Sequence, residues 1–184
     1  GKILADPDKD RLFIADSGHN RIVITRRDGQ VLDIAGSGEA GAKDGTFEDA
    51  NFFHPQGMAL DGDVLYVADT ENHLIRRLDL ASRTVTTIAG TGQQASFLSA
   101  RGLGTGAALS SPWDLALVGN NLYIAMAGTH QIWVMDLTNT LVEPYAGTRR
   151  EGIRDGTLDG SDWAQPSGIS SDGKKLYVAD SETS

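Results

Sequence analysis

Aspartates that recur at the end of similar apolar runs are the first candidates for chemistry in this sequence. They lie in the elements Ala-Asp-Ser and Ala-Asp-Thr, at Asp16, Asp69 and Asp180. Arranged around an axis, such carboxylates form a ring that can hold a divalent metal, as in a metal-dependent hydrolase or lyase. An aspartate that begins a tight turn instead accepts hydrogen bonds from backbone N–H groups two or three residues ahead. Met126 takes the corresponding place after another such run, which would interrupt a metal ring and favours the structural role in turns.

Histidines follow these positions closely and suggest a zinc site as a second type of chemistry. Three imidazoles that face one axis can bind zinc, and His19, His73 and His130 lie in the same turn region. Their registers differ, because His73 aligns with His130 whereas His19 aligns with Asn72. We therefore expect hydrogen bonds that cap turns or join neighbouring repeats, and no bound metal or cofactor.

The remaining motifs give no support for an active site. Lys43-Asp-Gly-Thr-Phe47 and Arg154-Asp-Gly-Thr-Leu158 contain an Asp-Gly turn signal, and the apolar residue after it is expected to fold back as an anchor. The ligand spacing of a calcium loop, a phosphate-binding loop, a dinucleotide fingerprint and a Gly-x-Ser-x-Gly nucleophile elbow are all absent. The sequence therefore predicts that these residues are not an enzyme. A metal-dependent hydrolase or lyase with channel-facing Asp and His is the alternative.

Composition limits the class of protein further. With 16 Lys and Arg against 25 Asp and Glu, the net charge of −9 opposes binding to a nucleic-acid backbone. The chain contains no cysteine, which excludes disulfides and thiol chemistry within these residues. No segment approaches the roughly 18 consecutive apolar residues of a membrane span. The 22 glycines among 184 residues indicate many tight turns and disfavour a helical bundle.

The elements that would position these residues are repeated along the chain. Apolar runs of the Leu-Tyr-Val-Ala type recur at spacings of 53, 57 and 54, centred on Ile14, Val67, Ile124 and Val178. Segments that begin Ala-Gly-Ser or Ala-Gly-Thr recur at spacings of 54 and 57, from Ala35, Ala89 and Ala146. Three prolines share the period, at Pro55, Pro112 and Pro166. Agreement among three markers establishes an internal repeat.

Each repeat contains four short strand patterns and no helical one, which predicts antiparallel β-propeller blades. The expected blades are residues 1–36, 55–90 and 112–147, followed by half a blade at 166–184, with long loops between them. The Leu-Tyr-Val-Ala runs are expected to be packed on both faces. The loops and the turns after the second strands should lie on one side of the disc, and loops on such a face commonly carry function.

The turns and loop ends of this face supply the candidate interaction residues. They are His19, Asn20, Glu71, Asn72, Trp113, Thr129, His130 and Gln165. We expect them to be exposed, although each residue could equally cap a turn or pack between blades.

Two strings resemble NHL repeats, which are propeller modules. Ala68-Asp-Thr-Glu-Asn-His-Leu-Ile-Arg76 precedes a strand that ends in Ala-Gly-Thr-Gly, and Ile124-Ala-Met-Ala-Gly-Thr-His-Gln-Ile-Trp133 is similar to a subgroup with methionine in place of the turn aspartate. The resemblance implies a ring of six blades, of which about three and a half are expected here, and a thioredoxin-like domain before the propeller. It also implies an interaction platform, whose partner is a protein or an adjacent domain of the same parent chain.

Overall fold

Short apolar runs separated by Gly- and Asp-containing turns fold into antiparallel strands in the computed structural model, which describes residues 1–96 and 101–182. Four sheets follow one another along the chain, and we call them blades 1 to 4. Blade 1 contains β1 (Ile3–Asp6), β2 (Arg11–Asp16), β3 (Arg21–Arg26) and β4 (Val31–Ala35). Blade 4 contains β15 (Pro166–Ser171) and β16 (Leu176–Asp180).

Blades 2 and 3 each contain five strands. Blade 2 consists of β6 (Pro55–Asp61), β7 (Val64–Asp69), β8 (Leu74–Asp79) and β9 (Thr84–Ala89), with β5 (Gly45–Thr46) paired to β9. Blade 3 consists of β11 (Pro112–Val118), β12 (Asn121–Met126), β13 (Gln131–Asp136) and β14 (Leu141–Ala146), with β10 (Gly102–Leu103) paired to β14. The sequence patterns did not predict β5 and β10, which the loops before blades 2 and 3 contribute.

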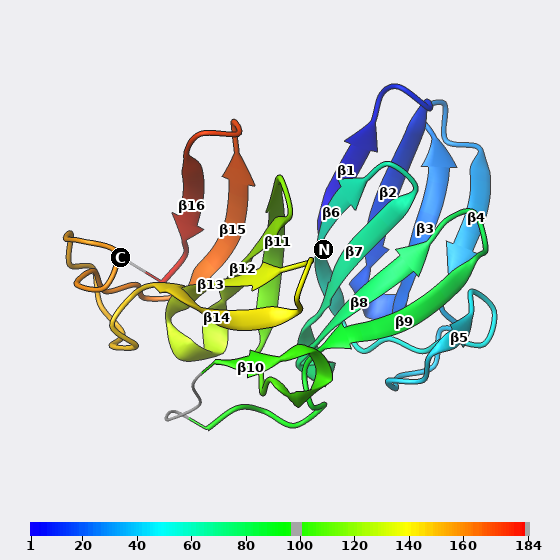
Figure 1. Ribbon diagram of the computed structural model, residues 1–184. Helices are drawn as coiled ribbons and strands as arrows, with labels where there is room; N and C mark the ends of the chain where they lie inside the picture. Colours follow the sequence, from blue (N-terminus) through cyan, green and yellow to red (C-terminus); the bar gives the residue numbers. More distant parts are fainter. Residues whose placement is uncertain (97–100, 183–184) are drawn as a thin grey trace.

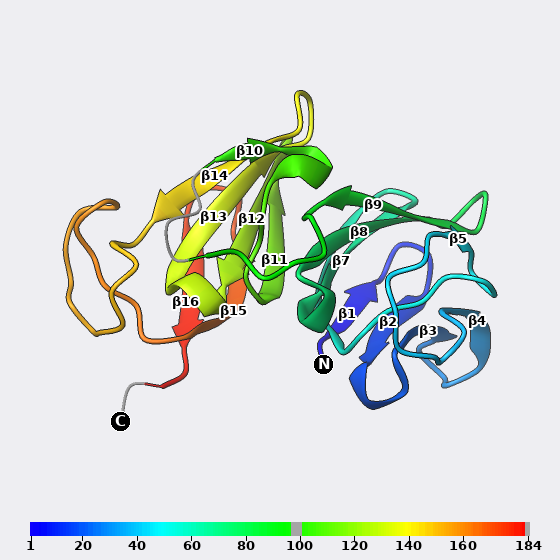
Figure 2. The ribbon, with the colours of Figure 1, turned by 90° about the horizontal axis from the view of Figure 1, so that it is seen from below.

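The blades stand side by side in chain order and pack face to face (Figures 1 and 2). Their first strands are innermost, because β6 lies against both β1 and β11, and β11 lies against β15. At this crowded centre a Cβ on Gly57 would lie 2.3 Å from the Cα of Asp114, so only glycine fits between β6 and β11. One apolar cluster fills each interface, formed around Phe13 and Val67, around Leu115 and Trp133, and around Ile132 and Ile169.

The expectation that every second strand is packed on both faces is correct for β7 but wrong for β16. All residues of β7 after Val64 are buried. In β16, exposed and half-buried residues alternate, and Tyr177 is 52% exposed. The reason is that β7 lies between blades 1 and 3, whereas among the described residues β16 has a neighbouring blade on one face only.

Short 3₁₀ turns join the second and third strands of the first three blades. They are η1 (Ser17–His19), η2 (Thr70–Asn72) and η4 (Ala127–Thr129); a fourth such turn, η3 (Gly104–Gly106), lies in the loop before blade 3. Each of the first three ends in a left-handed residue, with φ of 51° at Asn20, 55° at His73 and 54° at His130. Asparagine and histidine are among the non-glycine residues that most often adopt this conformation.

The long loops approach these turns, as expected for a shared face. The Asn20 amide donates a hydrogen bond to the Gly38 carbonyl, and the Asn72 amide donates one to the Gly41 carbonyl at 2.6 Å. We call this end of the molecule, with its turns and interblade loops, the loop face. Within residues 1–96 and 101–182, no helix has the length and apolar character needed to span a membrane.

Candidate functional site

The left-handed residue of each turn contacts the chain segment that enters the next blade. Asn20 accepts a hydrogen bond from the His54 N–H through Oδ1 at 3.0 Å, and His73 accepts one from the Ser111 N–H through Nδ1 at 3.0 Å. Burial lowers the pKa of His73, although the charge of Glu71 opposes the shift. At the next junction the direction is reversed, because the partner of His130 Nδ1 is the Ala164 carbonyl, which can only accept. These side chains therefore join neighbouring blades.

The recurring aspartates lie beside these turns, but their hydrogen-bond donors differ from those expected. Asp69 accepts from the Phe53 N–H at 2.7 Å, from the Asn72 amide at 2.8 Å and from Arg76 Nη1 at 2.7 Å. Asp180 accepts from two backbone N–H groups of the preceding loop, those of Ala164 and Gln165. The expectation of donors two or three residues ahead along the backbone is wrong here, because the loop that precedes the blade supplies the N–H groups.

The electrostatic settings of these aspartates also differ. Partial burial opposes ionisation of Asp16, but contacts with His19 Nδ1 and Arg21 Nε, both at 2.8 Å, hold its pKa below the usual value. At Asp69, burial is the largest influence and raises the pKa, whereas Arg76, Asn72 and the Phe53 N–H favour the charged form.

Blade 3 replaces this polar arrangement with an apolar one. Met126 takes the place of the aspartate, and its Sδ lies 3.3 Å from the Ser110 N–H, which corresponds to the Phe53 N–H in blade 2. Trp133 takes the place of Arg76 and is completely buried. Its Nε1 donates to Gln131 Oε1 at 3.1 Å. The two blades therefore fill the same position with an ion pair in one case and with packed apolar side chains in the other.

Arg76 is the most highly coordinated charged residue of blade 2. Its fully buried guanidinium donates to the carboxylates of Asp69 and Asp44, at 2.7 and 2.8 Å. It also donates to the carbonyls of Asn51 and Lys43, at 2.8 and 2.9 Å. Its Cζ lies 5.1 Å from the centre of the ring of Phe52, within cation–π distance. Four of these five groups, all but Asp69, belong to the loop before the blade, so this loop fixes the third strand.

The loops before blades 2 and 4 have the same internal hydrogen bonds, and we call residues 36–54 and 147–165 the clasp loops. The Gly36 N–H donates to the Phe47 carbonyl at 2.8 Å, as the Gly147 N–H does to the Leu158 carbonyl at 2.7 Å. The Asn51 N–H donates to Lys43, as the Asp162 N–H does to Arg154, both at 3.0 Å. Phe47 is 1% exposed and anchors its loop as predicted. The same prediction is wrong for Leu158, which is 55% exposed.

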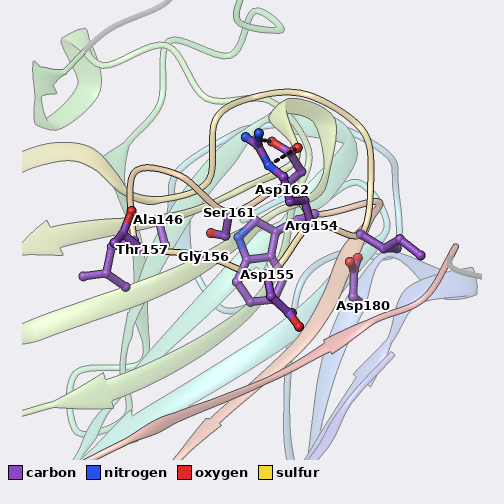
Figure 3. A pocket seen from close by; sticks show the side chains of 11 residues that line it. Ala146, Arg154, Asp155, Gly156, Thr157, Ser161, Asp162 and Asp180 are labelled. Carbon is purple, nitrogen blue, oxygen red and sulfur yellow. Dashed lines mark hydrogen bonds and ion pairs between the residues drawn. The ribbon is translucent and has the colours of Figure 1, made fainter.

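The second clasp loop and the end of β16 line a cavity of about 520 Å³ (Figure 3). Its wall combines carboxylates with apolar side chains: Asp155, Asp162, Asp180, Ile153, Leu158 and Trp163. Arg154 pairs with Asp162 through Nε at 3.1 Å, and Figure 3 shows this pair at the edge of the cavity. Among the described residues, Trp163 Nε1 is a buried donor with no hydrogen-bond partner.

The structure places the predicted interaction residues in three settings. His19 and Glu71 are exposed at the loop face, whereas Asn20, Asn72, His130 and Gln165 are half-buried in the contacts between turns and loops. Thr129 is only 3% exposed, so its expected exposure is wrong: η4 buries it together with Ala127.

Trp113 lies near the axis of the molecule. It is half-buried on β11 and lines a cavity of about 300 Å³ together with Lys2, Gln56 and Asp114. Lys2 Nζ donates to Asp114 Oδ1 at 2.8 Å across this cavity. Trp113 therefore lies among the inner strands, whereas the other candidates lie in turns and loop ends.

Sequence reasoning missed two exposed residues at the junction of blades 1 and 2. Phe53 is 37% exposed, and its ring packs edge-on against that of His54 with centroids 5.2 Å apart. Glu71 adjoins them, since its N–H donates to the Phe53 carbonyl. The available signal was the repeat itself, because the other two junctions carry small or polar residues at these positions (Ser110-Ser111 and Ala164-Gln165).

The aspartates and histidines that suggested metal chemistry are each engaged in contacts with turns or loops. Within the described ranges, no group of three or more His, Cys, Asp or Glu side chains is arranged so that it could hold a metal ion.

Comparison with known proteins identifies the repeat. The sequence profile of the NHL repeat matches residues 52–78 and 109–135. NHL repeat-containing protein 2 of Gallus gallus is 41% identical over 209 aligned residues, which cover 100% of this chain and 29% of the relative. Protein SUPPRESSOR OF QUENCHING 1, chloroplastic, of Arabidopsis thaliana is 44% identical over 192 residues, covering 100% of this chain and 18% of the relative. The chain thus spans less than a third of the length of these curated relatives.

A solved structure shows the same architecture. An auxiliary nutrient binding protein from Bacteroides thetaiotaomicron superposes with a TM-score of 0.68 and 19% identity, over 92% of this chain and 42% of that one. At this identity the likeness establishes the fold, which is that of a partial β-propeller with antiparallel blades.

Proposed function

Because the chain is an NHL-repeat β-propeller segment, we propose that it is a non-catalytic scaffold whose loop face binds a protein partner or a neighbouring domain of the same polypeptide. NHL-repeat proteins are generally interaction modules, which supports the coarser part of this proposal. The thioredoxin-like domain implied by the family resemblance is the neighbouring domain that we propose.

The observation that carries the proposal is the exposed patch formed by Phe53, His54 and Glu71, which we call the junction patch. An exposed aromatic ring lies here among groups that can donate and accept hydrogen bonds. Aromatic residues held on a rigid support are typical of the sites that dominate protein–protein binding energy. The support is rigid because Asn20 and Asp69 hydrogen-bond to the backbone of His54 and Phe53.

The catalytic alternative requires aspartates and histidines that converge on the axis. The carboxylates of Asp16 and Asp69 instead receive hydrogen bonds within their own turns and loops, and His73 uses its Nδ1 to hold the next blade. These contacts use the groups that an active site would need, and they support the scaffold.

Site-specific photo-crosslinking in the full-length polypeptide tests the proposal. A photoreactive amino acid in place of Glu71 should crosslink to the partner or neighbouring domain, whereas one in place of Asp28, in the turn at the opposite end of blade 1, should not. With the purified partner, Phe53→Ser should weaken binding at least tenfold. Tyr145→Ser is the matched control, because Tyr145 on β14 is exposed to the same extent, 38% against 37% for Phe53.

Two outcomes would overturn the proposal. One is equal crosslinking from the positions of Glu71 and Asp28. The other is a stoichiometric divalent metal in the full-length protein, bound by the loop-face aspartates and histidines and needed for hydrolysis or elimination of a substrate.

A further inference from the structure

The cavity beside β16 is lined by the counterparts of all the residues that hold Arg76 in blade 2. Arg76 contacts two carboxylates, two carbonyls and one ring, those of Asp69, Asp44, Lys43, Asn51 and Phe52. When blade 2 and its loop are aligned with blade 4 and its loop so that Asp69 matches Asp180, each of these five residues has a counterpart that lines the cavity. In the same order, the counterparts are Asp180, Asp155, Arg154, Asp162 and Trp163. Because the clasp loops share their internal hydrogen bonds, these groups are held in the same relative order.

The third blade lacks the arginine and also lacks both of the acids that hold it in blade 2. At its position Trp133 replaces the arginine, Met126 replaces the blade aspartate and Arg101 replaces the loop aspartate. Both carboxylates are thus absent from blade 3, where the third strand presents Trp133. In blade 1 the third strand presents Val23 at this position, and Asp16 pairs with Arg21 instead. Blade 4 carries both, at Asp155 and Asp180, so its cavity is complementary to a cation.

The edge of β16 provides the second element of a binding site. Within the described part of the chain β16 pairs only with β15, whereas its counterpart β7 pairs with both β6 and β8. In blade 2 this pairing places Arg76 opposite Val67. The counterpart of Val67 is Val178, which is half-buried on β16.

We propose that this cavity is a socket for an arginine on a β-strand that pairs antiparallel with β16, with the arginine opposite Val178. The occupant is a strand of the β8 type, in which apolar residues accompany the arginine, supplied by polypeptide outside residues 1–182. The guanidinium lies between the carboxylates of Asp155 and Asp180 and over the ring of Trp163. The apolar part of the strand covers Leu158 and Ile153, which are 55% and 71% exposed. This inference does not depend on the junction patch, because blade 4 and its clasp loop supply every group.

A peptide drawn from the chain itself tests the socket. The probe is the acetylated, dye-labelled sequence of residues 73–80, and binding to the 184-residue chain is followed by fluorescence anisotropy. We expect saturable binding that weakens at least tenfold when the peptide carries Arg76→Met, and less than threefold when it carries Arg77→Met. In the chain, Asp155→Asn should weaken binding at least tenfold. Asp172→Asn, in the exposed turn between β15 and β16, should not.

A covalent version keeps the test valid if the free peptide binds too weakly to detect. The sequence of residues 70–80 is attached after Asp180, which raises the effective concentration of the strand. We expect this extension to raise the melting temperature, and an extension with Arg76→Met to raise it by less than half as much. Equal effects of the two extensions, or equal binding of the two peptides, would overturn the socket. A chain dimer that forms without peptide and is unchanged by Asp155→Asn would instead assign the edge of β16 to a second copy.

Discussion

The clasp loops before blades 2 and 4 follow the same path, but their side chains lie in very different surroundings. In the first, Phe47 is fully buried and Asp44 accepts a hydrogen bond from Arg76 at 2.8 Å. In the second, Leu158 is largely exposed and Asp155 lines an open cavity. Backbone hydrogen bonds within the loop therefore determine its path, because these bonds are the same with and without a third and fourth strand beside it.

The side chains of the first clasp loop are buried where the third and fourth strands of its blade, β8 and β9, lie beside it. The two loops therefore show two separate effects. The Asp-Gly turn sequence encodes the local structure of the loop, whereas its contribution to stability depends on strands that lie far along the chain. Two measurements test this separation, one on two neighbouring residues and one on the two loops, and a third concerns the junction formed by His73.

Removal of the Arg76 charge should have the largest effect. We expect Arg76→Met to lower the free energy of unfolding by about 4 kcal/mol, because the buried Asp69 carboxylate loses its partner. Urea denaturation measures the loss. Arg77→Met is the control: the Arg77 side chain is 35% exposed and pairs with Asp79, so its loss should cost less than about 1 kcal/mol. Equal losses for the two variants would show that the ion pair has no special role.

The second largest effect is expected at the anchor residues of the two clasp loops, Phe47 and Leu158, which should differ in their contribution to the free energy of unfolding. Phe47→Ala is expected to cost about 3 kcal/mol, because it leaves a cavity in the core between blades 1 and 2. Leu158→Ala should change the free energy of unfolding by no more than about 0.5 kcal/mol, since its side chain is already exposed. The same denaturation experiment measures both. Similar losses would mean that Leu158 is buried in solution and that the loops are equivalent.

The smallest effect is expected in the pH dependence of stability, at the junction of blades 2 and 3 where His73 contacts Ser111. Since burial lowers the pKa of His73, the unfolded chain binds a proton more readily, and stability should fall as the pH drops below the unfolded value of about 6.5. His73→Asn should abolish this part of the pH dependence while keeping an acceptor for the Ser111 N–H, as Asn20 does for the His54 N–H. Unfolding free energies between pH 5 and 8 provide the test, and an unchanged slope in the variant would contradict it.

The repeat pattern predicted the blades well because it follows local chemistry. Alternation of apolar residues located the strands around Val67 and Ile124, and prolines marked the starts of the inner strands. The sequence did not reveal β5 and β10, because two-residue strands that begin with glycine have no periodicity to detect.

The contacts of the candidate site were less predictable because their partners are distant in the chain. Asp44 and Arg76 lie 32 residues apart, and no local pattern links them. The burial of Thr129 depends on the packing of η4 beneath the loop before blade 3, and Phe53 was overlooked because only one junction carries an aromatic residue there. Alignment of the blades with one another, rather than of single motifs, recovers both the socket and the junction patch.

The order of these parts along the chain has a consequence for how the molecule is made. The first clasp loop precedes the strand that it holds, so it leaves the ribosome first: Lys43 and Asp44 are synthesised before Arg76. Domains generally begin to fold from the N-terminus during synthesis. The loop is thus available as a template when the third strand of its blade emerges, and blades can be completed one after another in the direction of translation.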